Sequence, residues 1–73
     1  MTVQHTELSP DDEALRSWDW RAALKAEERT IPWLARRTDR AQRTVYGYAY
    51  GQLTPPLEWL RAAAEVLRKD AVA

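Results

Sequence analysis

The chain has 73 residues, 45% of them hydrophobic and 30% charged, with eleven basic and eleven acidic side chains and no cysteine. A chain of this length forms one small domain that buries only about 60% of its unfolded surface, and it can form neither a disulfide nor a thiolate metal site. No apolar run is long enough to span a membrane and no signal peptide begins at Met1, so we expect a cytoplasmic protein.

The charges are unevenly distributed along the chain, although their sum is zero. Residues 1–20 carry five carboxylates against one arginine, whereas residues 21–54 carry seven basic side chains against three acidic ones. Residues 55–73 are balanced. Zero net charge argues against a strongly basic nucleic-acid binder. The basic middle of the chain nevertheless suits a phosphate backbone, although an ordinary solvated surface would have the same composition.

In chain order, residues 1–8 lack periodicity and predict a flexible tail ahead of a single domain over residues 9–73. Ser9 and Pro10, followed by three carboxylates, are typical of a helix start. They predict a helix over 10–28. That helix carries two apolar stripes, whereas a helix of a small domain usually needs one. The stripes are Leu15, Trp18, Ala22 and Ala26, and Trp20, Ala23 and Leu24.

Residues 30–51 predict two short helices joined by a tight turn. Thr30 can cap the first helix. Its buried face is predicted by i, i+3, i+4, i+7 spacing and consists of Ile31, Leu34, Ala35 and Thr38. Asp39 tolerates a left-handed conformation in the turn. The second helix is predicted over about 41–50, and Gly51 fits a left-handed helix stop.

A last helix is predicted from about residue 56 to residue 69, after a proline-containing connector. Its two apolar stripes are Leu57, Leu60, Ala64 and Leu67, and Trp59, Ala63 and Val66. No segment alternates with period two, so no strand is expected. The sequence therefore predicts a compact all-α domain of four main helices, or four to five in all.

Two pieces of sequence in register carry a family resemblance. The first is LARRTDRAQRTVYGYAYG, with Leu34, Val45, Tyr48 and Gly51 at fixed intervals, and the second is PLEWLRAAAEVL from Pro56. Over about residues 20–68 this pattern resembles the lambda-repressor/Cro family of helix-turn-helix proteins. The resemblance implies a helix-turn-helix at 30–51 and a transcriptional regulator of phage or mobile-element type, acting in a bacterial host cell.

In such a motif the second helix lies in the major groove and its N-terminal half meets base edges. Gln42 can pair with adenine and Arg43 with guanine. Tyr46 and Gly47 are the other candidate base-reading residues. Candidate phosphate contacts, which position a protein without reading sequence, are Thr30, Arg36, Arg37, Arg40, Thr44 and Gln52.

Four positions depart from the family pattern. The turn glycine is replaced by Asp39, which places a negative charge near the DNA. The capping serine or threonine is Ala41, and a lost cap costs about 1 kcal/mol. Ile31 replaces a glutamine that often contacts phosphate. Gly47 lowers helix propensity by up to about 1 kcal/mol and would let the backbone come close to a base or a partner.

Four tryptophans are more than a core of this size can hide, so we expect some rings to be exposed. Trp20 should be core, and Trp33 lies opposite the buried stripe of its helix. A homodimer or partner surface is the sharper hypothesis for the spare apolar residues, namely Leu15, Trp18, Trp59 and Val66. The alternative is that these side chains enlarge the core.

The predicted function is sequence-specific binding of double-stranded DNA by a Cro- or repressor-like regulator. The alternative is a protein-interaction module on the same fold, such as an antirepressor or an inhibitor of a host protein. The sequence contains no nucleophile–base set, phosphate-binding loop or metal-ligand spacing. We therefore expect no enzymatic activity, no cofactor or metal, no small-molecule substrate and no membrane partner.

Overall fold

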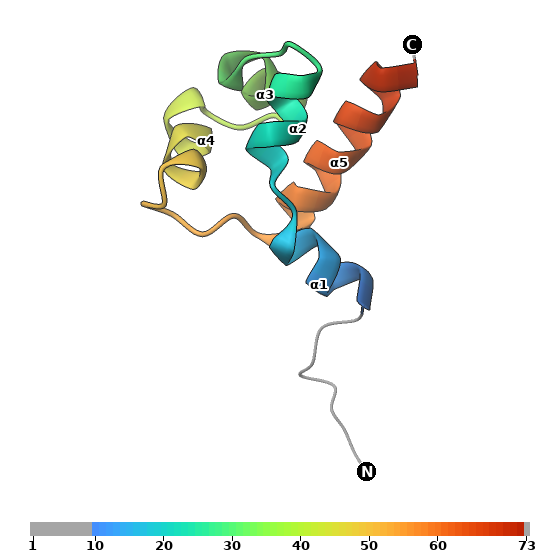
Figure 1. The fold of residues 1–73 in the computed structure, drawn as a ribbon. Helices are drawn as coiled ribbons and strands as arrows, with labels where there is room; N and C mark the ends of the chain where they lie inside the picture. The colour runs from blue at the N-terminus through green and yellow to red at the C-terminus, as the bar shows by residue number, and fades with distance from the viewer. Residues whose placement is uncertain (1–9, 73) are drawn as a thin grey trace.

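The computed structural model describes residues 10–72 and contains five helices and no strand within that range (Figure 1). The helices are α1 (Pro10–Ser17), α2 (Trp20–Ala26), α3 (Ile31–Arg37), α4 (Gln42–Ala49) and α5 (Leu57–Val72). The long α5 packs against α1, α2 and α3, while α4 packs against α3. The all-α prediction is thus confirmed for this part of the chain. None of its helices is both long and apolar enough to cross a membrane.

The expectation of one continuous helix over 10–28 is wrong. The chain breaks at Trp18 and Asp19, where the Asp19 carboxylate accepts a hydrogen bond of 3.1 Å from the amide of Ala22 and so caps α2. The break divides the first stripe: Leu15 packs from α1, whereas Ala22 and Ala26 lie exposed on α2, which brings Trp20 into the core. Two short helices can therefore direct Leu15 and Trp20 towards the core at different angles, which one straight helix cannot do.

The other boundaries lie close to those predicted, apart from the last. Helix α5 continues to Val72, three residues beyond its predicted end at 69. The predicted cap at Ser9 and the predicted tail over 1–8 lie outside the described residues.

Three successive helices end at a residue with left-handed backbone. Asp39 (φ 57°) ends α3 and Gly51 (φ 82°) ends α4, as the sequence predicted, and Glu28 (φ 57°) ends α2. After α3 the amide of Arg40 donates to the carbonyl of Ala35 at 2.9 Å, and the equivalent five-residue hydrogen bond follows α2 and α4. These bonds satisfy carbonyls that a helix end would otherwise leave free.

Glycine is the residue that adopts left-handed backbone most readily. We therefore expect Glu28→Gly to raise the free energy of unfolding by about 1 kcal/mol, because it removes the clash between Cβ and backbone. Glu27→Gly, at the neighbouring position where φ is −88°, is the matched control and should lower stability by about 0.5–1 kcal/mol. Urea unfolding of the two variants measures both effects. A loss of stability in Glu28→Gly would contradict the explanation.

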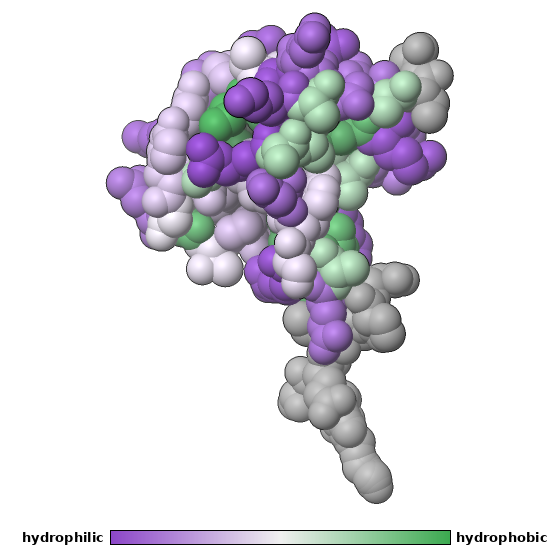
Figure 2. All heavy atoms as spheres, in the orientation of Figure 1, coloured by the Kyte–Doolittle hydropathy of each residue, from purple (hydrophilic) through white to green (hydrophobic). Residues whose placement is uncertain are grey.

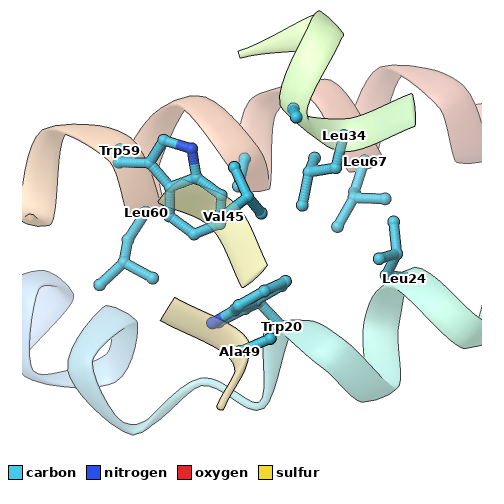
Figure 3. Packing of buried hydrophobic residues seen from close by; sticks show 10 residues of the cluster. Trp20, Leu24, Leu34, Val45, Ala49, Trp59, Leu60 and Leu67 are labelled. Carbon is cyan, nitrogen blue, oxygen red and sulfur yellow. The ribbon is translucent and has the colours of Figure 1, made fainter. Parts of the chain in front are cut away.

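Trp59 of α5 lies in the core beside Trp20 (Figure 3), which it meets edge-on at 5.0 Å between ring centroids. Its ring also meets that of Tyr48, at 4.9 Å between centroids. The expectation that Trp59 is spare surface is wrong, because only 1% of the residue is exposed. The other buried apolar residues are Trp20, Leu24, Leu34, Ala35, Val45, Ala49, Leu60, Ala63 and Leu67. Trp20 is core, as predicted.

The buried indole has a polar partner. Its Nε1 donates to the hydroxyl of Thr38 at 3.0 Å, and that hydroxyl donates to the carbonyl of Leu34 at 2.8 Å. Thr38 is itself buried. A buried tryptophan N–H usually finds a hydrogen-bond acceptor, and the hydroxyl of Thr38 removes the cost of burying this one unpaired.

Removing that acceptor should be costly. Thr38→Val keeps the shape of the side chain but leaves the indole N–H buried without a partner, so the free energy of unfolding should fall by about 1–3 kcal/mol. Thr54→Val, in the exposed connector before α5, is the control and should change it by less than about 0.5 kcal/mol. Chemical denaturation followed by tryptophan fluorescence measures both variants. Equal stability of the two would rule out a structural role for this hydrogen bond.

Candidate nucleic-acid interface

Helices α3 and α4 pack together around the turn that contains Asp39. Thr30 caps α3 as predicted, since its hydroxyl accepts from the amide of Trp33 at 3.3 Å. Ala41 precedes α4 with extended backbone and makes no side-chain cap. The first amides of α4 therefore have no side-chain oxygen as partner, and α4 begins directly at its polar residues.

The outward side of α4 carries the predicted base-reading residues of the first turn. Gln42 and Arg43 are exposed, and Tyr46 is half-exposed one turn later. Tyr50, directly after the helix, is 64% exposed. Arg43, Tyr46 and Tyr50 follow i, i+3, i+7 spacing and form one line, which we call the outer stripe. In Figure 2 the surface over α4 is mostly pale, the colour of residues of intermediate hydropathy.

The two tyrosines of the outer stripe form a stack that α2 supports. Their rings are 6.0 Å apart and nearly parallel, at 13°. The guanidinium of Arg21 lies over the Tyr50 ring at 5.6 Å, and its Nη1 donates to the carbonyl of Ala49 at 3.1 Å. A cation at the end of a helix also complements the helix dipole. Sequence reasoning missed Arg21 and Tyr50, although the i, i+4 spacing of the two tyrosines was a usable signal.

Arg21 therefore links α2 to the end of α4. Arg21→Ala should lower the free energy of unfolding by about 0.5–1 kcal/mol, because it removes the hydrogen bond to Ala49 and the contact with Tyr50. Lys25→Ala removes the same charge from the same helix at an exposed position and is the control. Thermal unfolding of both variants tests the link. A larger effect of Lys25→Ala would overturn it.

Gly47 is not on the exposed reading surface, contrary to the prediction. It is buried, and Leu53 covers it. The loop after Gly51 folds back because the amides of Gln52 and Leu53 both donate to the carbonyl of Gly47, at 3.0 and 3.1 Å. The predicted backbone approach to DNA at this glycine is therefore blocked by the protein's own chain.

The arginines divide into two groups. Seven have a hydrogen bond, a carboxylate or an aromatic ring as partner: Arg16, Arg21, Arg29, Arg37, Arg40, Arg61 and Arg68. Within residues 10–72, Arg36 and Arg43 alone among the arginines have none of these. Both belong to the α3–α4 segment, at the end of α3 and in the first turn of α4. The two arginines without such a partner thus both belong to the segment that forms the candidate interface.

The remaining predicted phosphate contacts are placed differently. Gln52 is exposed, Thr44 is half-buried and the hydroxyl of Thr30 is engaged in its cap. Arg40 is exposed at the turn but pairs with Glu58 at 3.3 Å. A surface pair of this kind is worth less than about 1 kcal/mol, so a phosphate can replace Glu58.

Arg37 lies away from α4. The guanidinium groups of Arg37 and Arg29 both lie over the ring of Trp33, at 5.4 and 4.8 Å from its centroid. Arg29 also forms a two-pronged pair with Asp70 of α5, at 2.8 and 3.1 Å. That hydrogen bonding raises the pKa of Arg29 above its ordinary value. Trp33 is accordingly a half-buried stacking partner for arginines.

The structure does not bring the predicted dimer surface together. Leu15 and Trp18 line a hollow between α1 and α5. Val66 lines a different hollow, with Arg37. Trp59, the fourth member, is buried in the core. Of the four residues predicted to form a dimer surface, Leu15 and Trp18 are therefore the two that share one apolar hollow.

No cluster of acidic or histidine side chains within the described residues could hold a metal ion. The chain matches no protein-family model, no curated protein and no solved structure. Its own residues and their arrangement are therefore the basis on which a function is proposed.

Proposed function

We propose that the protein is a sequence-specific binder of double-stranded DNA, a transcriptional regulator of the lambda-repressor/Cro type. In this proposal α3, the turn and α4 act as a helix-turn-helix, and α4 enters the major groove with its first turn towards the bases. Gln42 and Arg43 read base edges, as amide and guanidinium groups do by bidentate hydrogen bonding to adenine and guanine.

The observation that carries the proposal is the distribution of free arginines. Arg43 stands on the exposed side of α4 with no carboxylate partner within residues 10–72, whereas Arg29, Arg61 and Arg68 on other parts of the surface each pair with a carboxylate. An unpaired guanidinium can bind a base or phosphate without first giving up an ion pair. Arg36 at the end of α3 adds a second free cation for the backbone.

One domain of this size makes few contacts with DNA, so tight binding requires two copies on paired half-sites. Selection of bound sequences from random duplex DNA tests the function and the symmetry together. An enriched palindrome whose affinity falls steeply with added salt is the expected result. Absence of salt-sensitive retention of any duplex would refute DNA binding.

Arg43→Ala should weaken binding of the selected duplex by about 1–3 kcal/mol and relax the preference at one base pair. Arg68→Ala, on α5 and paired with Glu65 at 3.1 Å, removes the same charge away from α4 and is the control. Fluorescence anisotropy on the selected duplex and on single-base variants measures both. Equal losses for the two variants would show that charge alone, without base reading, accounts for binding.

A protein-interaction module is the second candidate function. The hollow between α1 and α5 favours it, because Ala14, Leu15, Trp18 and Ala64 give it an apolar lining. Arg61, Glu65 and Arg68 stand around that lining. Apolar surface with a polar rim is typical of protein interfaces. Trp18→Ala would abolish assembly and leave DNA affinity per domain intact if this surface serves a partner.

A further inference from the structure

Leu53 occupies the place of a side chain that α4 lacks. A Cβ built on Gly47 would stand 2.8 Å from Cδ1 and 3.1 Å from Cγ of Leu53. Real Cβ atoms do not approach other atoms so closely, so the leucine sits where residue 47 would otherwise project. Gly47 lies one helical turn after Arg43 and thus on a neighbouring part of the same side of α4.

The loop holds this leucine in a defined position. The amides of Gln52 and Leu53 both bond to the carbonyl of Gly47, and Gly51 provides the left-handed turn that brings the chain back. Despite its contact with α4, Leu53 is 49% exposed. Part of its side chain is therefore open to solvent, at the place where a side chain of residue 47 would project.

The side of α4 consequently has two chemically different halves. Its beginning presents the hydrogen-bonding groups of Gln42 and Arg43. Its end presents the exposed apolar side chains of Leu53 and Tyr50. Tyr50 is stacked on Tyr46 and contacts Arg21. Leu53 and Tyr50 are the large apolar residues that stand exposed within residues 10–72.

In the major groove the only apolar group on a base edge is the C5-methyl of thymine. We propose, on the basis of the DNA-binding function above, that Leu53 recognises a thymine methyl beyond the base pairs that Gln42 and Arg43 read. Leu53 is then a specificity-determining residue contributed by a loop rather than by the helix itself.

The free arginines favour DNA over a protein as the occupant of this surface. Leu53 adjoins the side of α4 from which Arg43 projects without a carboxylate, and Arg21 contributes a further cation beside Tyr50. An apolar side chain with cations nearby matches the major groove of DNA, where thymine methyl groups lie on the base edges and phosphates border the groove.

Deoxyuridine substitution tests the proposal, because it removes the C5-methyl and leaves every hydrogen-bonding group of thymine in place. Each thymine of the selected duplex is replaced in turn, and affinity is measured by anisotropy. One thymine in each half-site should lose about fourfold in affinity, the value for one buried methyl-sized group. Thymines in the flanking sequence are the internal control and should lose nothing.

Leu53→Ala should bind the thymine and deoxyuridine duplexes equally. Gly47→Ala is a second variant with the same expected result, since its methyl group displaces Leu53. Alanine also has a helix propensity about 1 kcal/mol better than glycine, which offsets part of the cost of displacing Leu53. Circular dichroism confirms that both variants remain helical.

Two results would overturn the proposal. One is a duplex bound without any effect of deoxyuridine, and the other is a methyl effect that persists in Leu53→Ala. If that variant also loses self-association, Leu53 belongs to a protein contact. Each leaves DNA binding itself intact, whereas a protein that retains no duplex at all refutes the underlying function as well.

Discussion

The hydrogen bond from the indole of Trp59 to the hydroxyl of Thr38 fixes the arrangement on which the rest of the molecule depends. Trp59 belongs to α5 and meets Trp20 of α2 and Tyr48 of α4. Thr38 closes α3, immediately before the turn. One buried ring therefore sets the positions of four helices, and the polar end of that ring is attached to the segment that aims α4 outward.

Much of the α3–α4 region could be predicted because its signals are local. Thr30 as a cap and Asp39 and Gly51 as left-handed stops follow from residue type and spacing. The break at Asp19 was missed because its cap interrupts an apolar pattern that reads as continuous. Burial of Trp59 was missed for a different reason: its acceptor lies 21 residues away in the sequence, so it could not be inferred from a helical pattern.

In the candidate site, too, some features follow from local sequence and others depend on contacts between distant segments. Exposure of Gln42 and Arg43 follows from the periodicity of α4. The contact of Leu53 with Gly47 depends on the path of the loop after Gly51, and the contact of Arg21 with Tyr50 depends on how α2 lies beside α4. Both features need the three-dimensional course of the chain. The sequence indicated that Gly47 is unusual in a helix, but the space beside it is filled by Leu53 of the same chain.

The pairing of arginines has a consequence for how such a protein would search a genome. Sequence-independent affinity for DNA grows with the number of phosphates that a protein neutralises. Here most arginines are already engaged within the fold, and the chain has no net charge. Random genomic sites, which outnumber any operator by about 10⁶ or more, would thus retain little of the protein. Under the proposed function, preference for an operator over these sites would therefore come from base contacts, whereas phosphate contacts would supply the salt-sensitive part of the affinity.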